Sequence, residues 1–134
     1  MSTQTALNLS AIGQIAHVVS NIDTATAFYK DTLGVPFLFS APPKLAFFDL
    51  GGVRLMLGEP ESAAENGRIG NNSVLYFKVN DIHSTYETLA ARGVAVDDKP
   101  HIIARLGTVD LWMAFFRDPD HNLIGIMSEV PVSG

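Results

Sequence analysis

The sequence predicts an α+β fold of two tandem strand–helix–strand–strand–strand modules, which form a curved mixed sheet around a cup with the helices packed outside. The main observation is an internal repeat, because residues 15–35 and 75–94 each read as an apolar strand, an Asn- or Asp-containing cap, an amphipathic helix, a Gly and a Val. Equivalent positions carry the same residues: Ile22 and Ile82, 60 apart, and Phe47-Phe48 and Phe115-Phe116, 68 apart. A repeat of this length indicates two copies of one supersecondary unit, neither of which can bury its sheet face alone.

The first module begins with a predicted strand at 12–19, which reads as buried on both faces. A helix follows from about Asp23, with Ser20 or Asn21 as its N-cap, and Gly34 suits the position just past its C-terminus. Pro and Gly pairs then separate three further strands, expected at about 35–40, 44–50 and 53–58.

The second module repeats this order after a polar, unperiodic linker. A strand is expected at 73–79 and a helix at about 82–92, which Gly93 ends. Three strands follow, at about 94–104, 109–116 and 122–128. His121 lies in the last tight turn, where a left-handed backbone conformation is expected. The domain division is therefore a leader at 1–10, a first module at 11–58, a linker at 59–72 and a second module at 73–130, all in one domain.

Composition argues against several classes of function. The chain carries a net charge of -5, and its nine Lys and Arg residues are scattered, so no basic stripe suited to nucleic acid is visible. The apolar runs fall well short of the roughly 20 residues that span a bilayer, and no signal peptide is apparent. A cytoplasmic protein without nucleic-acid or membrane partners is therefore expected. The absence of cysteine excludes disulfides, thiolate metal ligands and a cysteine nucleophile.

Four segments resemble the vicinal oxygen chelate superfamily, which includes glyoxalase I, extradiol dioxygenases and bleomycin-resistance proteins. They are QIAHVVSNIDTATAFYKDTLGV, FFDLGGVRLML, LYFKVNDIHSTYETLAARGV and LWMAFFRDPDHNLIGIM, and together they span nearly the whole chain in the family's order. The resemblance implies a cup that binds a small molecule, and a homodimer. It does not name a reaction, because the superfamily covers isomerases, lyases, oxygenases, thiol transferases and non-catalytic binders.

The metal-dependent members take four ligands, usually His, Gln or Glu, from four strands. The corresponding positions here are Gln14, Met56, Val74 and Gly125. Only Gln14 offers a suitable donor, because a thioether prefers Cu(I), and Val and Gly bring no side-chain donor. No cofactor is therefore predicted at the usual site. A displaced divalent-metal site stays open as an alternative, with Gln14, His101 and Glu129 as its ligands.

His101 is the predicted catalytic residue, on a strand that can contribute to the mouth of the cup. Arg105, four residues on, shares its face if the strand is regular. The two can act as an acid/base and an anion clamp, and the alternative is that both are ordinary residues of an edge strand. His17 is expected to point away from Gln14, because strand side chains alternate, and so to be a packing histidine.

Further ligand-binding residues are expected on the same side as the mapped ligand positions. Tyr76 offers a hydroxyl there, and Arg54 or Lys78 can receive a carboxylate or phosphate. The alternative for both cations is an exposed charge at a strand end. Trp112 can stack on a planar or cationic ligand, or can belong to the core or a dimer interface.

Three functions fit these residues. The leading hypothesis is a small-molecule binder of the glyoxalase and bleomycin-resistance type that works without the usual divalent metal. The alternative is an enzyme, a lyase, isomerase or dioxygenase that acts on a small oxygenated substrate through a displaced metal or metal-free acid/base chemistry. The third is an interaction module whose cup is filled by its own side chains, among them Met56, Phe116 and Trp112.

Overall fold

The computed structural model describes residues 7–132, and it contains two mixed sheets of four strands. The first module contains β1 (Gln14–Val18), α1 (Ile22–Ala27), the π-helical turn η1 (Phe28–Thr32), β2 (Phe37–Ala41), β3 (Leu45–Leu50) and β4 (Val53–Gly58). A short 3-10 helix, η2 (Ala63–Arg68), joins the modules. The second module contains β5 (Leu75–Lys78), α2 (Ile82–Ala91), β6 (Ala95–Arg105), β7 (Val109–Arg117) and β8 (Leu123–Pro131).

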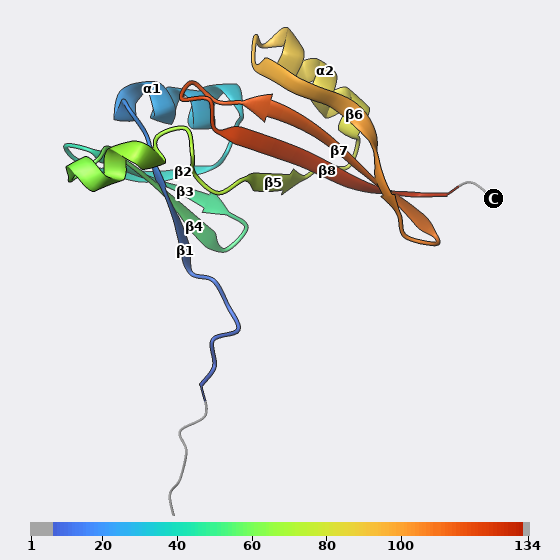
Figure 1. Cartoon of the computed structure of the whole chain (residues 1–134), viewed down its shortest axis with the longest axis horizontal. Helices are drawn as coiled ribbons and strands as arrows, with labels where there is room; N and C mark the ends of the chain where they lie inside the picture. Colours follow the sequence, from blue (N-terminus) through green and yellow to red (C-terminus); the bar gives the residue numbers. More distant parts are fainter. Residues whose placement is uncertain (1–6, 133–134) are drawn as a thin grey trace, which may run out of the picture.

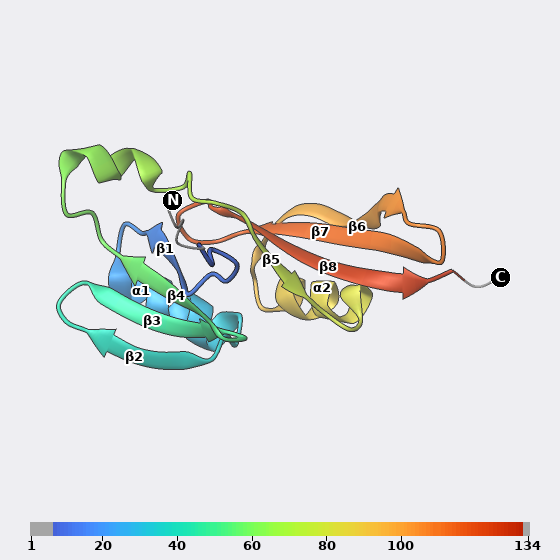
Figure 2. The same cartoon turned by 90° about the horizontal axis from the view of Figure 1, so that it is seen from below.

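The two sheets have the same topology. Their strand orders are β1-β4-β3-β2 and β5-β8-β7-β6, and in each the first and last strands of the module run parallel while the other neighbours are antiparallel. The modules lie side by side along the long axis, with α1 and α2 above their sheets (Figure 1), and from below the first sheet lies in front of α1 (Figure 2). The predicted α+β fold of two tandem modules is confirmed.

Equivalent residues of the repeat start the two helices. The side chain of Asn21 accepts a hydrogen bond from the backbone N–H of Thr24 at 2.9 Å, and that of Asp81 accepts one from Ser84 at 3.1 Å. Each cap satisfies a backbone donor that the first helical turn leaves without a partner. The helices end differently, because α1 continues as the π-helical turn η1.

Each helix packs on one face of its own sheet, and the two cores meet. Val19, Ala25, Tyr29, Phe48 and Leu55 are among the residues of the first core. The second core is smaller, and it includes Ile82, Leu89, Ala114, Phe116 and Ile126. Three half-buried residues, Phe28, Leu33 and Phe77, pack against both cores. The apolar interior is therefore continuous from one module to the other.

Polar contacts also join the modules, and the one between Tyr29 and Asp118 is buried. The Tyr29 hydroxyl donates to a carboxylate oxygen of Asp118 at 2.8 Å, and that same oxygen accepts from the side-chain amide of Asn122 at 2.8 Å. The side chain of Asn72 accepts from the backbone N–H of Val18 at 3.0 Å and donates to the Val18 carbonyl at 2.8 Å. Ser20 adds a link, because its backbone N–H and its hydroxyl both donate to Asp120.

Two sequence predictions need correction. The strand predicted at 12–19 is not buried on both faces, since Gln14 and Ala16 are exposed, because a helix covers only one face of the sheet. The linker predicted at 59–72 is not irregular throughout, because it contains η2, which contacts β1. Most of the leader at 1–10 lies outside the described residues. No helix within residues 7–132 is both long and apolar enough to cross a membrane.

Candidate functional site

The face of the first sheet that α1 does not cover presents a row of apolar side chains, three of them large. The register places Ala16 beside Met56, Met56 beside Phe47, and Phe47 beside Phe39. Phe39 and Phe47 stack with their ring centroids 4.6 Å apart, and the side chain of Phe39 remains 46% exposed. We call this surface the open face of the first sheet.

Three of the predicted site residues meet on this open face. The Nε of Arg54 donates to Oε1 of Gln14 at 3.1 Å, and Nε2 of Gln14 lies 3.8 Å from the sulfur of Met56. The guanidinium of Arg54 also lies over the ring of Phe47, 5.4 Å from its centroid. A cation in this position is attracted by the ring face. The cluster therefore holds a positive charge beside an apolar surface.

The open face of the second sheet is built around Tyr76. The ring of Tyr76 lies over Gly125, where an added Cβ would approach within 2.6 Å of that ring, and it meets Phe115 edge to face with centroids 5.9 Å apart. The next row of the sheet runs Lys78, Met127, Met113 and His101. The glycine at this position gives the tyrosine ring the space it occupies.

A groove of about 960 Å³ runs between the modules along β5. Its lining is mainly apolar and comes from the start of β1, the loop after η1, the β3–β4 turn, β5, α2 and β8. Tyr76 and Lys78 contribute from the second sheet, and Asp49 contributes from the open face of the first sheet. Ligand pockets of proteins have volumes of about 300–1,000 Å³ and mostly apolar walls. The groove has room for a small organic molecule.

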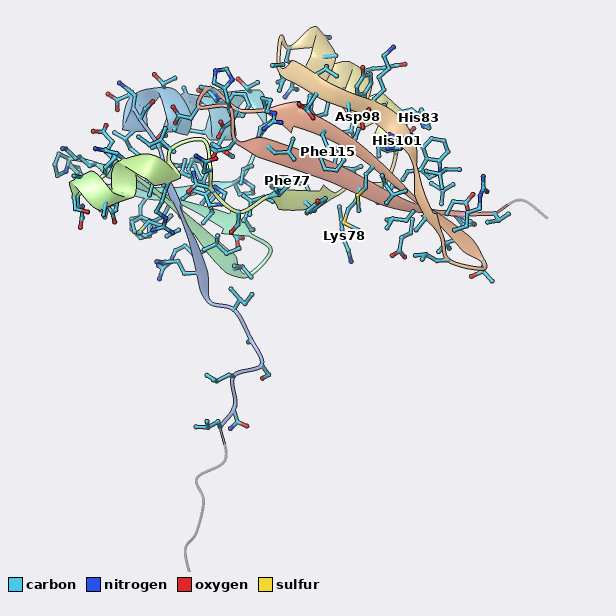
Figure 3. All side chains as sticks on the ribbon, in the orientation of Figure 1. Phe77, Lys78, His83, Asp98, His101 and Phe115 are labelled. Atoms are coloured by element: carbon cyan, nitrogen blue, oxygen red, sulfur yellow. The ribbon has the colours of Figure 1, made fainter. Side chains whose placement is uncertain are left out.

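Among the predicted ligand-binding and catalytic residues, Tyr76 and Lys78 line this groove, and the others do not. His101 is exposed on β6, with Nδ1 2.8 Å from the Lys99 carbonyl and 3.6 Å from a carboxylate oxygen of Asp98. Arg105 pairs instead with Asp110 at 3.3 Å. Figure 3 shows His101 and Asp98 close together near β6, with Lys78 projecting from β5 away from them.

Trp112 lies on the face of the second sheet that packs on α2. Its ring meets the exposed His83 edge to face, with centroids 5.0 Å apart, and it packs against the second core. Its neighbours Ala114 and Phe116 are fully buried on the same face. The structure therefore separates Trp112 from Tyr76 and Phe115, which point to the open face.

His17 is buried, as the alternation of strand side chains predicted, with only 3% of its surface exposed. Neither of its ring nitrogens has a hydrogen-bond partner among the described residues. Burial lowers the pKa of His17, while the Asp118 carboxylate opposes that change and the positive charge of Arg68 adds to it. Burial and the same carboxylate raise the pKa of Tyr29 far above its ordinary value. Both groups are therefore neutral near pH 7.

Sequence reasoning missed Phe47 and Phe39 as members of the open face. A signal for Phe47 was present, because a tight turn at Gly51-Gly52 that pairs Leu50 with Val53 also pairs Phe47 with Met56. Phe39 could not be placed in this way, since a register shift interrupts the pairing of β2 with β3.

The four mapped metal-ligand positions do not fit a divalent metal. Gln14 and Met56 come together, but Val74 offers no donor and the Tyr76 ring occupies the space above Gly125. The alternative set is spread over two sheets, with Gln14 on β1 of the first, and His101 and Glu129 separated by β7 in the second. Within residues 7–132, no three His, Asp or Glu side chains gather as a metal site would require.

The family sequence model of the Glyoxalase/Bleomycin resistance protein/Dioxygenase superfamily matches residues 11–126 of this chain. The chain belongs to this superfamily. One relative is the uncharacterized protein YraH of Bacillus subtilis (strain 168), which is 35% identical over an alignment of 123 residues that covers 84% of this chain and 94% of YraH. The shared length covers both modules.

Solved structures of this superfamily have the same fold. A member from Sphaerobacter thermophilus DSM 20745 matches with a TM-score of 0.74 and 23% identity, over 90% of this chain and 98% of that one. TnmS3, an antibiotic-binding protein from Streptomyces sp. CB03234, gives a TM-score of 0.72 and 24% identity, over 92% and 99%. Lactoylglutathione lyase from Agrobacterium tumefaciens gives 0.66 and 24%, over 89% and 93%. At these identities the likeness concerns the fold alone.

Proposed function

We propose that this superfamily member binds a small organic molecule without the divalent metal that its metal-dependent relatives use. The observation that carries the proposal is the replacement of the ligand set, because the Tyr76 ring lies over Gly125 where a fourth ligand would stand. The two open faces and the groove between the modules supply apolar surface with a few polar groups. Apolar surface with a few polar groups is typical of sites that bind a small organic molecule.

We further propose that the protein is a homodimer. The strands β1 and β5 are edges of their sheets, with backbone groups on one side that pair with no strand of the described chain. Exposed edges of this kind are usually covered in native proteins. A second copy would cover them in a symmetric way.

Native mass spectrometry of gently purified protein, with metal analysis of the same sample, tests both proposals. We expect the mass of a dimer without stoichiometric metal, and an unchanged melting temperature when Zn²⁺, Ni²⁺ or Mn²⁺ is added in excess. Gln14→Ala is the control, since a genuine metal site would lose its one suitable donor. A stoichiometric metal that Gln14→Ala abolishes would overturn metal-free binding, and a monomer would overturn the dimer.

The enzymatic alternative rests on His101, because the nearby Asp98 carboxylate can orient its imidazole. If the chain is a lyase, an isomerase or a dioxygenase, an organic molecule retained in the purified protein should change mass on incubation. This change should stop in His101→Ala while binding persists. Equal behaviour of wild type and His101→Ala would contradict a catalytic role for His101.

A further inference from the structure

The guanidinium of Arg54 is held at one end and free at the other. Its Nε donates to Gln14 at 3.1 Å and its plane lies over Phe47. Its two terminal nitrogens make no hydrogen bond with any residue that the structure describes. These nitrogens form the fork that recognises a carboxylate through two parallel hydrogen bonds. The Arg54 side chain is therefore held in place, and its two terminal nitrogens remain available to a ligand.

The positive charge of Arg54 is not neutralised by an ion pair. The ion pairs between residues 7 and 132 involve His101, Arg105 and Arg117, and Arg54 takes part in none of them. Asp49 stands opposite Arg54 in the β3–β4 ladder, but its carboxylate accepts from the backbone N–H of Gly52 at 2.8 Å. Arg54 contacts Gln14 and Phe47 and forms no ion pair with its cross-strand carboxylate among the described residues.

An aromatic surface adjoins this charge. Phe47 is stacked on Phe39 with an angle of 25° between the ring planes, and Met56 lies next to Phe47 in the register. The two rings face each other, so they present their edges, beside Met56, as an apolar surface of the sheet. An aromatic ring packs favourably against ring edges in an edge-to-face arrangement, and sulfur also contacts aromatic rings favourably.

We propose that the open face of the first sheet selects a planar aromatic molecule that carries a carboxylate. The ligand ring packs against the edges of Phe47 and Phe39 and against Met56, and the carboxylate receives hydrogen bonds from the terminal nitrogens of Arg54. Gln14 acts as a positioning residue, because it holds the Nε of Arg54 and so directs the fork outward. The inference rests on the proposed function, since it names the class of ligand that the metal-free site takes.

Three probes of one shape test the inference by isothermal titration calorimetry on the full chain: 2-naphthoate, the uncharged 2-naphthamide and the cationic 2-naphthylmethylammonium. We expect 2-naphthoate to bind wild type at least about tenfold more tightly than the amide, a factor that corresponds to about 1.4 kcal/mol. Arg54→Gln should remove this preference and leave the affinity for the amide unchanged. Arg54→Lys should retain part of it, because the charge remains while the planar fork is lost.

Lys30→Gln is the matched control. Lys30 also stands over an aromatic ring of the first module, 5.0 Å from the centroid of Phe37, and its removal changes the net charge by the same amount. It should keep the full preference for 2-naphthoate. Equal binding of acid and amide to wild type, or an equal preference in Arg54→Gln, would overturn the inference and leave metal-free binding intact. Failure of all three probes to bind would also overturn it, and the metal analysis would then decide the proposed function separately.

Discussion

At the scale of single residues, His17 is the side chain whose environment departs most from what its chemistry favours. Its imidazole is buried without a hydrogen-bond partner in the described chain, on β1, which contacts η2. The charged groups that act on it are Asp118 and Arg68. A buried polar group without a partner costs about 1–3 kcal/mol. Its effect on stability should therefore be measurable.

We expect His17 to make the protein less stable in acid. Its pKa is lower in the folded chain than the ordinary value of 6.5. As the pH falls below 6.5, the unfolded chain takes up a proton that the folded chain does not, so the free energy of unfolding falls by up to about 1.4 kcal/mol per pH unit. The loss ends once the pH drops below the folded pKa, because both states are then protonated.

This effect is measured by urea denaturation of wild type and His17→Leu between pH 8 and pH 5, in steps of roughly half a pH unit. The leucine variant should lose the part of the slope that His17 contributes, and at pH 8 it should be about 1 kcal/mol more stable, since an unpartnered polar group is removed. His83→Gln, which changes an exposed histidine of α2, is the control and should keep the wild-type slope. Parallel pH profiles for wild type and His17→Leu would contradict the assignment.

At the scale of elements, the turn between β7 and β8 of the second module is hydrogen-bonded to η1 of the first module. Asp118 accepts hydrogen bonds from the Tyr29 hydroxyl, from the Asn122 side chain and from two backbone N–H groups of the turn. His121 takes a left-handed φ of 68° there, as the sequence predicted. This contact joins residues that lie 89 positions apart in the chain.

Tyr29→Phe should destabilise the protein by about 1.5–3 kcal/mol, because the change removes a buried hydrogen bond to a charged group and leaves the ring in place. The midpoint of urea denaturation measures the loss. Tyr86→Phe is the matched control, since Tyr86 packs on Phe116 in the second core and its hydroxyl makes no hydrogen bond to the described residues. Equal losses of stability in the two variants would show that the hydrogen bond from Tyr29 to Asp118 contributes no more than the hydroxyl of Tyr86.

At the scale of the whole molecule, the modules are repeats in sequence but not independent units in structure. Leu75 and Ile124 of the second module belong to the first core, and Phe28, Leu33 and Phe77 pack on both cores. The apolar groove also lies between the modules. Its shape therefore depends on how tightly the modules are joined.

We expect both modules to unfold in one cooperative transition, because their cores are continuous. Trp112 is the one tryptophan of the sequence, and it lies in the second module, so its fluorescence follows that module alone. Urea curves followed by Trp112 fluorescence and by far-UV circular dichroism should coincide at one protein concentration. Different midpoints would mean that the first module unfolds separately.

The sequence by itself determined the two modules and the approximate positions of the eight strands and of α1 and α2. Local signals suffice for this, since hydrophobic periodicity, the caps at Asn21 and Asp81, and the glycines after each helix act within a few residues. The resemblance to the superfamily, mapped onto the repeat, located Gln14, Met56 and Gly125 as equivalent to metal-ligand positions. It could not exclude that neighbouring side chains restore the missing donors.

Only the tertiary structure decided which side chains share a surface. The contact between Gln14 and Arg54 spans 40 positions of the chain and depends on the parallel pairing of β1 with β4. The ring of Tyr76 occupies the space above Gly125 because β5 pairs with β8 in the same parallel way. Contacts of this kind follow from strand register and from packing between sheets, which no local pattern encodes. Strand register therefore separates His101 from Arg54 and brings Arg54 to Phe47.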